Sequence, residues 1–204
     1  MSSDFKKFWV GQTISNLGSS FTQWAIPLLV YQLTHSALSL GIATAFTFVP
    51  YLLFGLLIGA WMDRVDRKKV MIVLDSVNAI VILSIPLVAQ FGHLTVWWIY
   101  VVTFIQSTIF IAFSAGEFAA IPSLVSTDDL VTANGRIQAT FSAAQVAGPL
   151  LAGALLSVMP LTWVMSFDAA SFAVSAVSLA LVRASFNAPS DEAKEPTKIL
   201  HDVR

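Results

Sequence analysis

The sequence contains no cysteine, only three histidines and few charged residues. The absence of cysteine excludes disulfide bonds and thiolate metal sites, and His35, His93 and His201 lie too far apart in sequence to suggest a local metal cluster. Asp, Glu, Lys and Arg make up 11% of the chain, against roughly 25% in soluble domains. The net charge of −1 disfavours a nucleic-acid partner, which needs a basic surface. We therefore expect no metal, no cofactor and no nucleic acid.

Long apolar runs take the place of charge. Residues 8–62 contain no Asp, Glu, Lys or Arg, and another apolar run begins at Val70. A helix of about 20 apolar residues crosses the ~30 Å hydrocarbon core of a bilayer, where backbone groups must be satisfied within the helix. The period-two alternation of a membrane barrel is absent. The sequence predicts an all-α membrane protein with six transmembrane helices, at 8–33, 37–62, 70–90, 96–116, 138–158 and 162–182.

The basic residues predict how this bundle is oriented. All eleven Lys and Arg fall on one side: before the first span, between spans two and three, between four and five, or after the sixth. The other three loops carry no charge. By the positive-inside rule both termini are cytoplasmic in a multi-pass protein of the cell membrane. Residues 1–183 then form the bundle, and the polar residues 184–204 form a cytoplasmic tail or the start of a linker to a second membrane half.

A dense charged segment, residues 59–69, follows the second span. It resembles the loop between helices two and three of the major facilitator superfamily, G-x-x-x-D-R-x-G-R-[RK], with Asp66 in place of a glycine. The matching residues are Gly59, Asp63, Arg64, Arg67 and Lys68. The resemblance implies a gating loop, in which Gly55 and Gly59 allow another helix to approach closely and Asp63 faces a helix N-terminus. The alternative is that any cytoplasmic loop of a membrane protein is basic.

A second stretch resembles the helix-five motif of exporters in this superfamily, G-x8-G-x3-G-P-x2-G-G, with alanine replacing glycine twice. Its residues are Gly135, Ala144, Gly148, Pro149, Ala152 and Gly153. Ala144, Gly148 and Ala152 recur every four residues and share one helix face suited to close packing, so an ordinary seam of small residues is the alternative. Residues 18–41, 120–125 and 133–135 are most similar to the branch that contains macrolide-efflux proteins and the enterobactin exporter.

The resemblance implies a particular architecture. Transporters of this superfamily have two six-helix halves around a central cavity, each half an inverted three-plus-three repeat, and work by rocking one half against the other. The six spans here correspond to one half, the N-terminal one. A complete transporter then requires a second half, supplied by a continuation of the native chain, which we favour, or by a second copy.

Three acidic residues lie inside or near the predicted spans. Asp168 lies ~10 Å into span six, where an ionised carboxylate costs about 2.5–3.5 kcal/mol to insert, so such residues are rare and often functional. It is the first candidate proton carrier; the alternative is a structural carboxylate bonded to nearby hydroxyl or amide groups. Asp75 is the second candidate. For Asp75 and Glu117, however, contact with the interface or pairing with the basic loop 64–69 is the favoured interpretation.

A polar stripe on the first span suggests a substrate cavity. Gln12, Asn16, Ser19 and Gln23 recur at spacings of three and four and share a face, and Gln106 can contribute from span four. A hydrogen-bonded seam between helices predicts the same stripe.

The predicted function is secondary active transport: export of hydrophobic small molecules, driven by a proton gradient through alternating access. Residues 94–116 lack the arginine that proton-coupled exporters of this superfamily often carry in helix four. If transport is coupled to protons, Asp168 or Asp75 must therefore carry the proton. The alternative is a non-transporting scaffold or partner subunit. An enzyme is not expected, because His-Glu-x-x-His, Gly-x-Ser-x-Gly and acid or histidine pairs at metal-ligand spacing are all missing.

Overall fold

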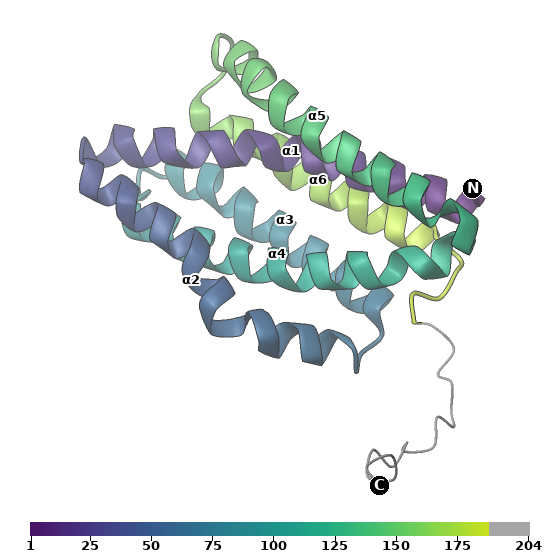
Figure 1. Cartoon of the computed structure of the whole chain (residues 1–204). Coiled ribbons are helices and arrows are strands. Elements are labelled where there is room, and N and C mark those ends of the chain that lie inside the picture. Colours follow the sequence, from purple (N-terminus) through teal and green to yellow (C-terminus); the bar gives the residue numbers. More distant parts are fainter. Residues whose placement is uncertain (188–204) are drawn as a thin grey trace, which may run out of the picture.

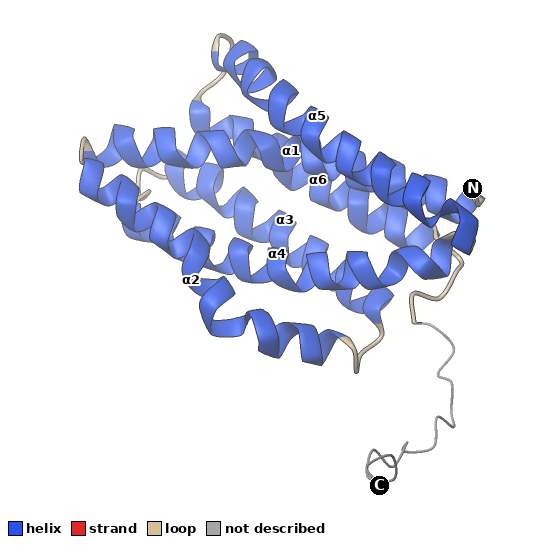
Figure 2. Ribbon diagram, viewed as in Figure 1, coloured by secondary structure: helices blue, strands red, loops and turns tan. Residues whose placement is uncertain are grey.

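A computed structural model describes residues 1–187, which form long helices joined by short turns (Figure 1). The helices are α1 (Ser3–Thr34), α2 (Ala37–Met62), α3 (Arg67–Gln90), α4 (Val96–Leu124), α5 (Leu130–Leu156) and α6 (Leu161–Leu181), with a short 3-10 helix, η1 (Thr127–Asp129). Within this described range no β-strand occurs (Figure 2). The prediction of an all-α protein is confirmed.

Polar residues in the turns define where several helices begin and end. The Ser36 hydroxyl accepts a hydrogen bond from the backbone N–H of Ser39 (3.3 Å) at the start of α2, and the Thr95 hydroxyl accepts one from Trp98 (3.3 Å) at the start of α4. His35 adopts the left-handed conformation (φ 48°) that ends α1. Such caps satisfy backbone groups that have no partner within the helix. Because the turns are short, successive helices run in opposite directions.

Five of the helices, α2 to α6, are long and apolar enough to cross a membrane. The exception is α1, whose amide and hydroxyl side chains reduce its apolar content. The prediction of six spans is therefore supported by composition for five. α1 packs along α6 and α5 over much of its length (Figure 1), so part of its polar surface contacts protein.

The helices extend beyond the predicted apolar spans. α4 continues to Leu124 and α5 begins at Leu130, so most of residues 117–137, which lie between the predicted fourth and fifth spans, is helical. α1 and α3 likewise begin earlier than predicted, at Ser3 and Arg67. Hydropathy marks only the apolar part of a helix, whereas the backbone hydrogen bonds continue into the polar residues at each end.

Each helix packs most extensively on its neighbours in the order α5, α1, α6, α3, α4 and α2. One apolar cluster, which includes Ile82, Ile99 and Met165, lies toward the end that carries the uncharged turns. A second, which includes Phe5, Phe8 and Met71, lies at the basic end. Every described Lys and Arg lies at or near that basic end, as the one-sided distribution in the sequence requires.

The segment after α6 is docked on the bundle. Phe186 is fully buried and meets the ring of Phe8 edge-on, with centroids 5.8 Å apart. The Asp4 carboxylate accepts hydrogen bonds from the backbone N–H groups of Arg183 (3.0 Å) and Ala184 (2.9 Å). Residues 184–187, expected to begin a polar tail or linker, are thus part of the bundle. The remainder of the predicted tail, 188–204, is outside the described residues.

Candidate functional site

Asp168 lies in the middle of the bundle, where α6 crosses α1. Its side chain is fully buried, and its Oδ1 accepts a hydrogen bond from the hydroxyl of Ser19 (3.2 Å). The Ser171 hydroxyl donates to the backbone carbonyl of Asp168 (2.8 Å) and lies 3.4 Å from Oδ1. Its Oδ2 is buried and has no hydrogen-bond partner among the described residues. Gly18 makes this crossing possible, because a Cβ at that position would lie 3.0 Å from the Asp168 Cα.

Asp75 is buried where α3 packs against α6. It is 2% exposed, lies beside the hydroxyl of Ser175, and has an Oδ2 without a hydrogen-bond partner in the described part of the chain. The same Ser175 hydroxyl accepts a hydrogen bond from Gln12 Nε2 (3.0 Å). Gln12, Ser175 and Asp75 therefore connect α1, α6 and α3 through polar groups. The expectation that Asp75 contacts the interface or the basic loop was wrong, because this face of α3 packs against α6.

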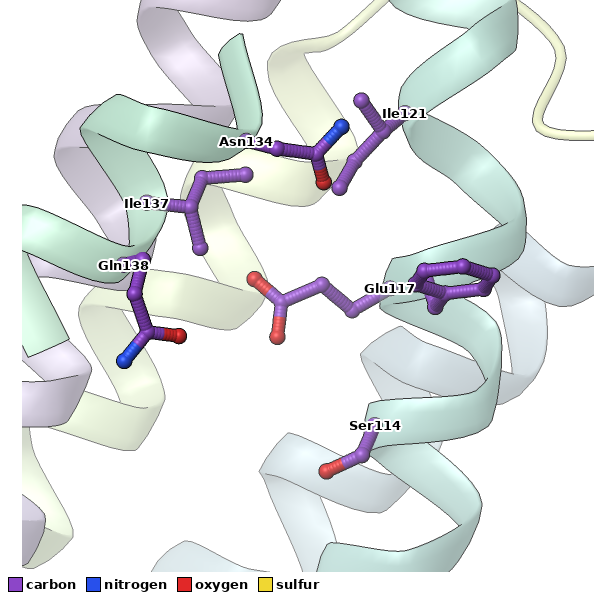
Figure 3. A pocket seen from close by; sticks show the side chains of 7 residues that line it. Ser114, Glu117, Ile121, Asn134, Ile137 and Gln138 are labelled. Atoms are coloured by element: carbon purple, nitrogen blue, oxygen red, sulfur yellow. The ribbon is translucent and has the colours of Figure 1, made fainter. Parts of the chain in front are cut away.

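Glu117 also turns away from the basic loop. It projects from α4 toward α5 (Figure 3), and its Oε1 is buried without a hydrogen-bond partner among the described residues. The four ion pairs of residues 1–187 use other groups. The expected pairing of Glu117 with residues 64–69 is therefore not found. Instead it borders a cavity of about 330 Å³ between the two helices.

The polar stripe of α1 is divided between two environments. Gln12 (4% exposed) and Ser19 are bonded to α6, in the hydrogen-bonded seam that the sequence offered as the alternative to a cavity. Gln23 is exposed, whereas Asn16 and, on α4, Gln106 are half-buried. Gln12 and Ser19 thus belong to the seam, and the cavity role of Asn16, Gln23 and Gln106 stays a prediction.

The charged loop is tied to the chain that follows α6. Asp63 and Arg67, four residues apart across the turn between α2 and α3, form an ion pair (3.1 Å). Arg67 Nη1 also donates a hydrogen bond to the carbonyl of Phe186 (3.2 Å). The Lys68 ammonium donates to the carbonyl of Val182. Arg64 is exposed. These bonds fix the orientation of the loop relative to α6.

Three small residues of the helix-five motif lie against α1. Ala144, Gly148 and Ala152 are buried, and a Cβ at Gly148 would lie 2.5 Å from the Cβ of Ser20. Pro149 lies within α5. At the other motif glycines, Gly135 and Gly153 on α5 and Gly55 and Gly59 on α2, a Cβ would meet no atom within 4 Å among the described residues. The close helix approach expected at Gly55 and Gly59 stays a prediction.

The cavity beside Glu117 was not predicted from the sequence. Asn134 and Gln138 are four residues apart on α5, and therefore lie on one helix face, which is a usable signal. What the sequence does not contain is the rotation of α4 that turns Glu117 toward them.

Comparison with known proteins identifies the family. The family model of the Major Facilitator Superfamily matches residues 8–201. The chain is 34% identical over 180 residues to macrolide efflux protein A of Streptococcus pyogenes, covering 88% of this chain and 44% of that protein. It is 26% identical to the uncharacterized MFS-type transporter YfiS of Bacillus subtilis, covering 95% of this chain and 46% of that protein. It is 24% identical to the enterobactin exporter EntS of Citrobacter koseri, covering 86% of this chain and 42% of that protein.

The chain thus spans less than half the length of these relatives. The family match nevertheless covers most of the sequence, and the helical fold and apolar spans agree with an integral membrane protein. This chain belongs to the major facilitator superfamily of membrane transporters.

Proposed function

We propose that this chain forms one six-helix half of an exporter of hydrophobic small molecules, driven by a proton gradient. The observation that carries the proposal is Asp168, a fully buried carboxyl group whose Oδ2 has no hydrogen-bond partner among residues 1–187. Ionised carboxylates are costly at such a position, and inside membrane proteins they mark proton and substrate pathways. The names of the relatives, macrolide efflux protein A and enterobactin exporter, support export as the direction.

In this proposal Asp168 alternates between protonated and ionised forms as the two halves of the transporter rock. The hydroxyl of Ser19 stabilises the ionised form by donating a hydrogen bond to Oδ1, and Oδ2, which has no partner among residues 1–187, can carry the proton. Asp75, on α3, is the second candidate carrier. A second half, from the same native chain or from a second copy, supplies the opposite wall of the substrate pathway, with both termini of this half in the cytoplasm.

The test is transport by the protein expressed from its native reading frame and reconstituted into lipid vesicles. A pH gradient is imposed and movement of a radiolabelled macrolide is followed. We expect Asp168→Asn to abolish gradient-driven transport, because the amide cannot release a proton, while the melting temperature in detergent stays close to that of the wild type.

The matched control is Asp128→Asn, the same change at an exposed carboxylate between α4 and α5, which should transport normally. Gradient-driven transport by Asp168→Asn at the wild-type rate would contradict a proton-carrying role for Asp168. If the wild type moves no substrate and instead co-purifies with another membrane protein, the scaffold function is the correct one.

A further inference from the structure

A cavity of about 330 Å³ lies between α4 and α5, toward the basic end of the bundle. It is separate from the Asp168 site, which lies between α6 and α1. Glu117 is seven residues before the end of α4, which places it ~10 Å along the helix axis from that end. The lining residues are Ser114, Glu117, Phe118, Ile121, Asn134, Ile137 and Gln138.

The cavity has several polar side chains that can accept hydrogen bonds. The Glu117 carboxylate points into it, and the side chains of Asn134 and Gln138 lie opposite, on α5 (Figure 3). The amide nitrogen of Asn134 already donates to the carbonyl of Leu130 (2.9 Å), and that of Gln138 donates to the Ser142 hydroxyl (3.5 Å). Each amide therefore keeps an oxygen that can accept a hydrogen bond and one further N–H that can donate.

Nothing in the described residues neutralises Glu117. Its Oε1 is buried without a hydrogen-bond partner, and none of the ion pairs of residues 1–187 includes it. The nearest basic residue in sequence on α5, Arg136, has its guanidinium over the ring of Trp9 on α1, 5.7 Å from the centroid. Glu117 is half-buried, and a carboxylate with a buried oxygen and no counter-charge is unfavourable, so a cation entering the cavity would be stabilised.

The rest of the wall is apolar. Ile121 and Ile137 line the cavity together with Phe118, which is 77% exposed. An aromatic ring can also attract a cation through its π face. A molecule that complements this wall combines an apolar body with one positively charged hydrogen-bond donor.

We propose that this cavity binds the protonated amine of an apolar substrate, with Glu117 as its counter-charge and the amide oxygens of Asn134 and Gln138 as additional acceptors. The proposal rests on the exporter function and specifies its substrate class as cationic amphiphiles. It requires only binding, so it is independent of how transport is driven.

The test measures equilibrium binding to the detergent-solubilised protein, expressed from its native reading frame, without any gradient. The probe is 2-(1-naphthyl)ethylamine, which is cationic at neutral pH, and its neutral N-acetyl derivative is the matched comparison. We expect the wild type to bind the amine about tenfold more tightly than the acetyl derivative, a difference of about 1.4 kcal/mol. Glu117→Gln should remove this preference and leave binding of the neutral compound unchanged.

Gln138→Lys provides a second variant at an exposed position, useful if Glu117→Gln does not fold. The new ammonium group would occupy the site and should also remove the preference for the amine. Asp128→Asn, outside the cavity, should retain it. Equal wild-type binding of the two probes, equal weakening of both by Glu117→Gln, or no binding of the amine would each overturn the proposal. Loss of proton-driven transport in Asp168→Asn with intact amine binding separates this inference from the proposed coupling.

Discussion

The side-chain amide of Asn187 bonds to both sides of the turn between α2 and α3. Its Nδ2 donates a hydrogen bond to the carbonyl of Val65 (2.8 Å), and its Oδ1 accepts one from the backbone N–H of Arg67 (3.1 Å). One residue that follows α6 therefore satisfies two backbone groups of the charged loop, 120 positions or more away in sequence. The loop and the chain after α6 form one structural unit.

Removing this amide should loosen the loop. We expect Asn187→Ala to speed amide hydrogen exchange across residues 63–69 and to lower the free energy of unfolding by about 1 kcal/mol, the usual net value of a hydrogen bond. Asn187→Asp keeps the acceptor for Arg67 but loses the donor to Val65, so its effect should be intermediate. Exchange-mass spectrometry in detergent measures both variants. Unchanged exchange in Asn187→Ala would contradict the bridging role.

Two glycines of α5 provide a matched pair for testing the contact with α1. A Cβ at Gly148 would lie 2.5 Å from the Ser20 Cβ, whereas a Cβ at Gly153 would meet nothing within 4 Å among the described residues. We expect Gly148→Ala to destabilise the bundle by about 1–3 kcal/mol through overpacking. Gly153→Ala should be neutral or stabilise by up to about 1 kcal/mol, because alanine favours a helix. Thermal unfolding in detergent distinguishes them; equal effects would show that α5 does not approach α1 closely at Gly148.

Asp66 should make the start of α3 sensitive to acid. Its Oδ1 accepts from the backbone N–H of Lys69 (3.1 Å) and its Oδ2 pairs with the Lys69 ammonium (3.0 Å). The Lys69 backbone N–H, and secondly its side chain, hold the pKa of Asp66 below its ordinary value of 3.8. A lowered pKa in the folded state means that this stabilisation is present above pH 3.8 and is lost as the pH falls through the folded-state value.

The variant that isolates this effect is Asp66→Asn, which keeps a capping oxygen but cannot ionise. We expect the difference in unfolding free energy between wild type and variant to be constant near neutral pH and to shrink below about pH 4. Unfolding in detergent across this pH range measures the difference. A difference that grows on acidification would show that the Asp66 charge does not stabilise the folded loop.

The orientation in the membrane can be tested with single cysteines, because the sequence contains none. His93 lies in the turn between α3 and α4, and Asp128 lies at the opposite end of the bundle, between α4 and α5; both are exposed. If the basic end is cytoplasmic, a membrane-impermeant maleimide should label His93→Cys in intact cells. It should label Asp128→Cys only after the membrane is opened. The reverse labelling pattern would show that the basic end lies outside the cell and would contradict the proposed topology.

The sequence predicted the secondary structure and the one-sided charge because both depend on local properties. A long apolar run specifies a helix in lipid whatever surrounds it. α2 occupies the predicted residues 37–62, and the basic residues reach one end because successive spans reverse direction. Local composition also explains where prediction was less accurate, since the polar residues of α1, and those between Leu124 and Leu130, do not show whether a helix continues.

The sequence by itself therefore determined the all-helical class, the positions of the apolar runs, the gathering of the basic residues at one end of the bundle, and the family motifs. Only the tertiary structure decided which groups meet: Gln12 with Ser175, Asp168 with Ser19, and Glu117 with the α5 cavity. The physical reason is that hydropathy is a property of a segment, whereas a side chain's partners depend on how each helix is rotated against its neighbours. Those rotations are fixed by close contacts between residues far apart in the chain, such as Gly18 with Asp168 and Gly148 with Ser20.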